Sequence, residues 1–118
     1  MSDSFNNIWE IYTSSWKAES AEEKMALFQK SLAPGCVYTD PLGKTHGWDA
    51  LCSYMLDFHK QIPGGHFVTN YFLAHHEMSI TKWDMCDASG NVLSDGISYG
   101  EYNQDGQLIK MTGFYQTP

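Results

Sequence analysis

The chain begins with a stretch in which apolar residues recur at helical spacing. Phe5, Ile8, Trp9, Tyr12 and Trp16 follow one another at three- and four-residue steps. Residues at this spacing share one face of an α-helix, so the pattern predicts an amphipathic helix with an unusually aromatic stripe.

Two more helices are predicted after this one. Ser20 and Glu23 have the spacing of a capping box and begin a helix over residues 20–32. Its apolar face comprises Ala21, Met25, Phe28 and Leu32. A third helix over residues 47–62 stops at the Pro-Gly-Gly of residues 63–65. Its apolar face comprises Leu51, Tyr54, Met55 and Phe58.

From His66 onward the period of the pattern changes to two. Residues 66–87 are rich in β-branched and aromatic side chains, and residues 92–103 and 108–115 have the pattern of strands. Residues 88–91 and 104–107 have the composition of turns. Helices first and strands afterwards predict a single α+β domain over residues 1–118, with the helices packed on one face of a curved antiparallel sheet.

The composition restricts the classes of partner. The formal net charge is -7 and Lys and Arg together number seven, so we expect no basic surface for nucleic acid or for an anionic membrane. The N-terminal residues MSDSFNNIWEIY lack the features of a signal peptide, and no apolar run reaches the length of a membrane span. These features predict a cytoplasmic protein.

Neither the cysteines nor the histidines predict a bound metal. Cys36, Cys52 and Cys86 are odd in number and far apart in the sequence, which is typical of free thiols in a reducing compartment. His75 and His76 are adjacent in a predicted strand, so they should face opposite sides of it and cannot chelate one ion together. We expect no metal and no cofactor.

One carboxylate stands at the end of a predicted short strand. The segment CVYTDPLGKTHG has alternating strand-like residues that stop at Asp40, before Pro41 and a glycine turn. Asp before Pro is common turn chemistry, so Asp40 can be a turn cap. It can also be the ionisable group of a cavity. Hydrogen bonds from the backbone amides of the turn favour the first interpretation, and exposure to a cavity favours the second.

The order of these elements resembles the nuclear transport factor 2-like superfamily over nearly the whole chain. The resemblance rests on two helices, a short strand ending in YTDPLG, a third helix, and antiparallel strands closing with DGQLIKMTGFY. It implies a cone in which the curved sheet wraps the helices around an apolar pocket. The superfamily includes ketosteroid isomerases, SnoaL-like polyketide cyclases, dehydratases and binding proteins.

Within it, the ketosteroid isomerases offer the closest chemical comparison. The resemblance implies that Asp40 is a general base and that Tyr12, on the first helix, donates a hydrogen bond to the developing oxyanion. Ser98 stands where those enzymes have a neutral aspartic acid, so the pattern is broken there. The implied function is a cofactor-free isomerase, cyclase or dehydratase acting on a small apolar carbonyl or ring compound. The alternative is a binding module for a small apolar ligand, or a dimerising structural domain.

Helical period, strand parity and the resemblance together predict which side chains line the pocket. The predicted lining residues are Trp16, Tyr54, Phe58, Trp83, Met85, Ser98, Met111 and Tyr115. His59, near the end of the third helix, either reaches the mouth of the pocket or interacts with the helix C-terminus. For any one lining residue, packing in the core is the alternative role.

The same parity predicts an apolar outer face on the last strands. Ile97, Tyr99, Ile109 and Phe114 should point away from the helices. Such a face is too apolar for solvent, so we expect a homodimer that pairs through it, as is usual in the superfamily that the chain resembles.

Overall fold

The structure is a computed structural model that describes residues 2–117. It contains three helices, α1 (Ser2–Lys17), α2 (Ala21–Ser31) and α3 (Trp48–Gln61). Its six strands are β1 (Leu32–Asp40), β2 (Gly43–His46), β3 (His66–His75), β4 (Met78–Cys86), β5 (Val92–Tyr102) and β6 (Leu108–Phe114). The predicted α+β class is confirmed.

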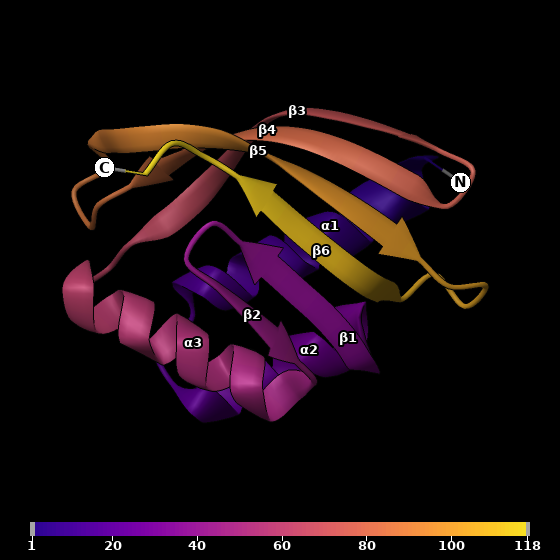
Figure 1. The fold of residues 1–118 in the computed structure, drawn as a ribbon, viewed down its shortest axis with the longest axis horizontal. Coiled ribbons are helices and arrows are strands. Elements are labelled where there is room, and N and C mark those ends of the chain that lie inside the picture. The colour runs from indigo at the N-terminus through magenta and orange to yellow at the C-terminus, as the bar shows by residue number, and fades with distance from the viewer. Residues whose placement is uncertain (1, 118) are drawn as a thin grey trace.

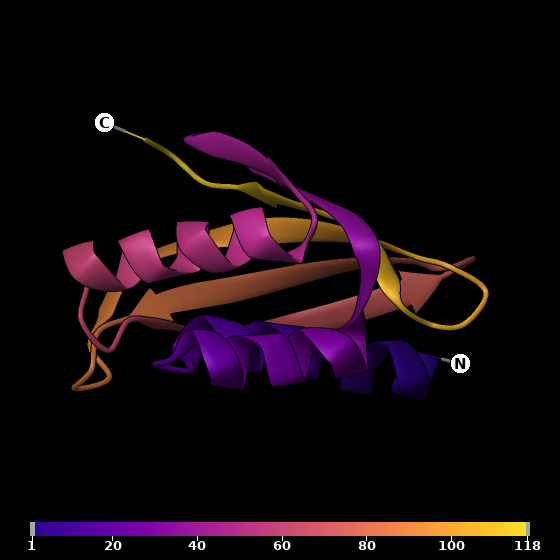
Figure 2. The same ribbon diagram turned by 90° about the horizontal axis from the view of Figure 1, so that it is seen from below.

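All six strands form one curved, unclosed sheet in the order β2-β1-β6-β5-β4-β3 (Figure 1). In Figure 1, α1 runs behind the sheet and α3 lies at its lower left; in the view from below, α3 lies in front of the strands, and α1 and α2 lie along the bottom of the picture (Figure 2). The sheet is mixed and not wholly antiparallel as predicted, because β1 runs parallel to β6. The period of the hydrophobic pattern shows which face of a strand is buried but not which strand it pairs with. The parallel pairing of β1 with β6 therefore cannot be predicted from the pattern.

The first two helices begin and end close to their predicted positions. Ser20 caps α2, and its hydroxyl oxygen accepts the backbone N–H of Glu23 at 3.1 Å, as the capping box predicts. The predicted apolar face of α2 was partly wrong, because Ala21 is exposed and Lys24 is buried in its place. Leu32 is buried too, but as the first residue of β1.

The segment after Asp40 contains a strand, β2, that the sequence pattern does not predict. β2 pairs with β1 as a hairpin whose register places Asp40 opposite Gly43, with Pro41 and Leu42 as the turn. A similar tight turn joins β3 to β4 at His76 and Glu77, whose φ angles are 48° and 61°. His76 therefore lies outside the strand, so the prediction that it faces away from His75 was wrong.

The centre of the core lies between the helices and the inner face of the sheet. Its fully buried apolar side chains are Phe28, Leu32, Leu51, Met55, Leu108 and Met111. Cys36, Cys52 and Cys86 are buried free thiols. No helix between residues 2 and 117 has both the length and the apolar character that a membrane crossing requires.

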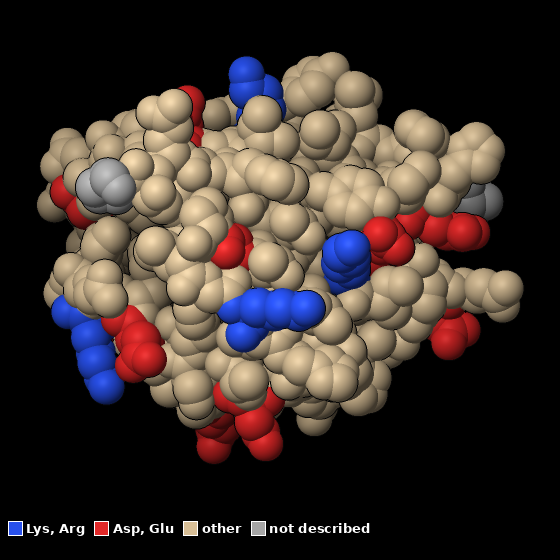
Figure 3. All heavy atoms as spheres, viewed as in Figure 1, with Lys and Arg blue, Asp and Glu red and all other residues tan. Residues whose placement is uncertain are grey.

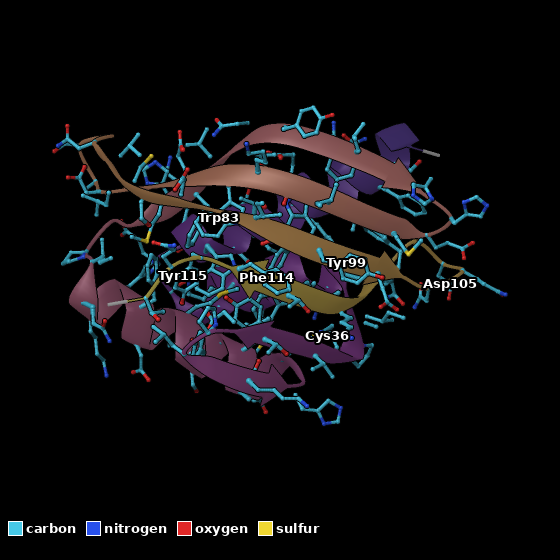
Figure 4. All side chains as sticks on the ribbon, turned by 45° about the horizontal axis from the view of Figure 1, so that its top comes forward. Cys36, Trp83, Tyr99, Asp105, Phe114 and Tyr115 are labelled. Carbon is cyan, nitrogen blue, oxygen red and sulfur yellow. The ribbon has the colours of Figure 1, made fainter. Side chains whose placement is uncertain are left out.

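The outer face of the sheet carries exposed apolar side chains, with the exposed Lys82 among them. The register aligns Tyr71, Lys82, Ile97 and Phe114 across β3, β4, β5 and β6. Tyr71, Ile97 and Phe114 are 51%, 40% and 59% exposed. Phe114 and Tyr99 come from the neighbouring strands β6 and β5 (Figure 4). On the face seen in Figure 3, lysine side chains stand apart, with acidic side chains among them.

A buried lysine joins α2 to the end of α1. The Lys24 side chain has no exposed surface, and its Nζ donates hydrogen bonds to the carbonyl oxygens of Ser15 at 2.8 Å and Ala18 at 2.7 Å. Carbonyl groups at a helix C-terminus lack intrahelical partners, so the lysine satisfies two of them. Burial lowers the pKa of Lys24 to about 8 from 10.5 in an exposed lysine.

The lowered pKa predicts that Lys24 makes folding stability depend on pH. Between pH 8 and 10.5 the folded state binds fewer protons than the unfolded state, so the lysine's contribution to the free energy of unfolding rises with pH. Relative to Lys24→Met, the wild-type protein should gain about 2 kcal/mol between pH 7 and 9.5. Urea denaturation of both proteins at each pH measures this difference, in which the tyrosine and cysteine contributions cancel.

A difference that does not change with pH would contradict this prediction. It would mean that the two carbonyl groups and the negative end of the α1 dipole fully offset the cost of burying the charge. Lys30, which is exposed on the same helix, provides the matched control as Lys30→Met.

Candidate active site and its cavity

Asp40 accepts four hydrogen bonds at the end of β1. Its Oδ1 atom accepts the backbone N–H groups of Leu42 at 2.8 Å and Gly43 at 3.0 Å, and the hydroxyl of Tyr54 at 2.7 Å. Its Oδ2 atom accepts only the Tyr38 hydroxyl, at 2.6 Å. With three donors Oδ1 is fully occupied, whereas Oδ2 keeps an unused lone pair.

The local sequence brings these donors together. Tyr38 and Asp40 are two residues apart in β1 and therefore face the same side of the sheet. Tyr54 approaches from α3, and the glycine at position 43 makes room for it. A Cβ atom on Gly43 would lie 2.9 Å from the Tyr54 ring, closer than the ring could stay. The turn, the strand and the helix thus meet at one carboxylate.

A cavity of about 500 Å³ extends from this carboxylate between α1, α3 and the sheet. Nine of the residues proposed from the sequence border it: Tyr12, Trp16, Asp40, Tyr54, Phe58, Trp83, Met85, Ser98 and Tyr115. The Trp16 ring lines it and packs against the rings of Tyr38, Phe58 and Phe67 at centroid distances of 5.3 to 5.5 Å. Nine of the 21 lining residues are aromatic.

Two predicted lining residues do not border the cavity. Met111 is 1% exposed and belongs to the core, because the part of β6 that carries it lies away from the cavity. The His59 ring Nε2–H donates to the Trp16 carbonyl oxygen. It caps the end of α1, so the helix C-terminus that it contacts is not that of its own helix.

The Tyr12 hydroxyl borders the cavity but does not contact Asp40. It accepts the indole N–H of Trp16 at 3.0 Å, and its own proton has no acceptor among the described residues. Burial raises the pKa of Tyr12, so the hydroxyl stays protonated at neutral pH. Tyr12 can therefore donate a hydrogen bond into the cavity.

Ser98, in β5, also accepts a hydrogen bond from a tryptophan side chain, as Tyr12 does in α1. Its hydroxyl oxygen accepts the Trp83 indole N–H at 2.9 Å. The Trp83 ring can lie across β5 because position 96 is glycine, where a Cβ atom would meet the ring at 2.5 Å. Trp83 also packs edge-on against Tyr115 at 6.1 Å, and the two lie near each other in Figure 4.

Gly113 lines the cavity between Asp40 and Ser98. A Cβ atom placed there would lie 3.7 Å from Asp40 Cβ, 3.7 Å from Ser98 Oγ and 3.9 Å from the Tyr38 hydroxyl oxygen. These are ordinary contact distances, so the wall has room for a methyl group but not for much more.

Charge around the cavity has one sign. Asp40 and Asp57 are the only charged residues that border it, and Lys, Arg and His are absent from the described lining. Asp57 lies at the mouth, where its side chain is 68% exposed and 3.5 Å from Lys60 Nζ. Burial, and after it the charge of Asp40, raises the pKa of Tyr115 to about 12.

Sequence reasoning missed several residues of the site. Tyr38 has the parity of Asp40, and Trp9 belongs to the aromatic stripe of α1, so both could have been found from the pattern. Thr69 had no such signal. Its hydroxyl oxygen borders the cavity side of β3, is buried, and has no hydrogen-bond partner. Within residues 2–117, no three His, Cys, Asp or Glu side chains meet in a metal-binding cluster.

No protein-family model matches the chain, and no curated protein matches its sequence. Similarity appears at the level of three-dimensional structure. A SnoaL-like family protein from Agrobacterium tumefaciens, named as a candidate isomerase, superposes with a TM-score of 0.88 at 21% identity, over 98% of this chain and 99% of that one.

Two further structures extend the comparison. A SnoaL-like protein of unknown function from Burkholderia thailandensis gives a TM-score of 0.76 at 15% identity, over 99% of this chain and 98% of that one. A candidate SnoaL-like polyketide cyclase from Jannaschia gives a TM-score of 0.75 at 12% identity, over 96% of this chain and 85% of that one. The chain therefore has the SnoaL-like, nuclear transport factor 2-like fold. At these identities the likeness shows the fold and not the activity.

Proposed function

We propose that the protein binds a small, flat, mostly apolar molecule in the cavity, with a polar group of that molecule beside Asp40. The observation that carries this proposal is the cavity itself: about 500 Å³ of aromatic-lined space with a carboxylate at one end. Such a volume is typical of small-molecule sites, as are a few converging polar groups in an apolar lining. The fold that the chain shares with SnoaL-like proteins is compatible with this role.

A cavity-filling substitution tests the proposal. The neutral fluorophore N-phenyl-1-naphthylamine should bind the wild-type protein at micromolar concentration with enhanced emission. Gly113→Val should weaken binding about tenfold or more, because its methyl groups would occupy the space between Asp40 and Ser98. Gly35→Val is the matched control, since Gly35 lies in β1 next to His46 and away from the cavity. Equal affinity in all three proteins would place the fluorophore elsewhere.

Proton transfer is a second candidate function, supported by the unused lone pair on Asp40 Oδ2. A carboxylate there could take a proton next to a carbonyl group, while the free hydroxyl protons of Tyr12 and Ser98 stabilise the resulting oxyanion. The two amide donors from the turn favour the alternative role of Asp40 as a turn cap. We therefore place binding first and catalysis second.

Two substitutions distinguish catalysis from binding alone. If a screened carbonyl compound is turned over, Asp40→Asn should abolish turnover and keep affinity. Tyr12→Phe should lower turnover about a hundredfold by removing one oxyanion donor. Single-turnover kinetics with saturating protein measures both effects, with Tyr71→Phe on the outer face as control. Full activity in Asp40→Asn would exclude Asp40 as the base.

We also propose a homodimer that pairs through the outer face of the sheet. The exposed apolar side chains of Ile97 and Phe114 support it, because they lie side by side on the adjacent strands β5 and β6. Three buried free thiols are compatible with a reducing compartment such as the cytoplasm.

A negative charge among these apolar side chains should separate the subunits. Analytical ultracentrifugation should give twice the chain mass for the wild-type protein at micromolar concentration and a single chain mass for Phe114→Glu, whose cross-strand neighbour is Ile97, since a buried unpaired carboxylate is costly. Ala26→Glu, on the exposed side of α2, should leave the mass unchanged. A wild-type monomer would refute the proposed dimer.

A further inference from the structure

We infer that the molecule held in the cavity is an organic cation, whose ammonium group lies beside Asp40 Oδ2 against the surrounding aromatic rings. This inference rests on the proposed binding function and names the class of ligand.

The first argument is the missing counter-ion of Asp40. Its four donors are two backbone amides and two phenols, all of them uncharged. Among residues 2–117 the ion pair between Lys60 and Asp57 lies at the surface, and Asp40 takes part in none. A carboxylate that borders an apolar cavity is normally paired, so a positive group on the ligand would complete its environment.

The second argument is the exclusion of anions. The described lining has no Lys, Arg or His, so an acid or a phosphate ester would meet a carboxylate and find no cation. In a site of low dielectric such an uncompensated charge is strongly disfavoured. The whole chain adds to this effect, because its net charge is -7 and its basic residues are all lysines. Its field attracts cations and repels anions.

The third argument is the position of the rings. The hydroxyls of Tyr38 and Tyr54 bind the two oxygens of Asp40, which places both rings beside the carboxylate, with centroids 5.6 Å apart. The ring centroid of Trp16 lies 5.5 Å from that of Tyr38 and 6.4 Å from that of Tyr54. A cation within about 6 Å of such ring faces is attracted by their negative potential. An ammonium group at Oδ2 would therefore lie beside a carboxylate and close to the rings of Tyr38 and Tyr54.

A set of three probes of similar shape tests the inference. Benzyltrimethylammonium carries a fixed positive charge, neopentylbenzene is its uncharged carbon analogue, and phenylacetate is an anion. Each competes with N-phenyl-1-naphthylamine for the cavity of the full chain. The cation should compete about tenfold better than the neutral analogue, and phenylacetate should not compete measurably.

Variants identify the group that recognises the charge. Asp40→Asn should weaken the cation about tenfold or more and leave the neutral analogue within about twofold. Asp57→Asn, at the mouth, should change neither by more than about threefold. Tyr115, which follows the last strand, gives a second test that separates its ring from its hydroxyl: Tyr115→Leu should weaken the cation several-fold, whereas Tyr115→Phe should not.

The outcomes separate this inference from the proposed function. A neutral analogue or phenylacetate that competes as well as the cation would overturn the inference and leave the binding function standing. Binding of the cation that does not depend on Asp40 or on Tyr115 would also overturn it. If neither N-phenyl-1-naphthylamine nor any of the three probes binds, both the inference and the proposed function are refuted.

Discussion

The site depends on one carboxylate that joins three parts of the chain. The turn after β1 donates two amides to Asp40, β1 itself donates the Tyr38 hydroxyl, and α3 donates the Tyr54 hydroxyl. Because the turn fixes the position of the carboxylate, the Tyr54 phenol that reaches it from α3 fixes the distance between α3 and β1. The end of the cavity and the packing of the third helix are therefore one hydrogen-bonded unit, which needs an acceptor oxygen at position 40.

The sequence predicts most of the fold because hydrophobic period reports which face of an element is buried. It predicts the helices, the capping box at Ser20 and the strand-rich second half. It does not predict β2, whose four residues are too few for a period and whose pairing is decided by the turn at Asp40 and Gly43. Nor does it predict Lys24 in the core, since a lysine is buried there only because unpaired carbonyl groups of α1 lie within reach.

The site is predictable to the same extent and for the same reason. Parity and helical spacing place Trp16, Trp83 and Ser98 on inner faces, and all three border the cavity. Met111 satisfies the same rule and lies in the core, because an inner face includes both packed and open regions. Where the cavity opens depends on contacts between elements, such as the space left by Gly113 between Asp40 and Ser98, and no pattern within one element encodes it.

The two chemical roles considered for Asp40 exclude each other for any one ligand. Oδ1 is saturated, so a base and a counter-ion would both have to use the remaining lone pair of Oδ2. An ammonium group bound there would block proton abstraction at the same atom. A catalytic ligand must therefore present an acidic C–H at Oδ2 and an oxygen toward Tyr12 or Ser98. A ligand that presents a positive charge at Oδ2 is held without being transformed, and the absence of any cation in the described lining favours that second arrangement.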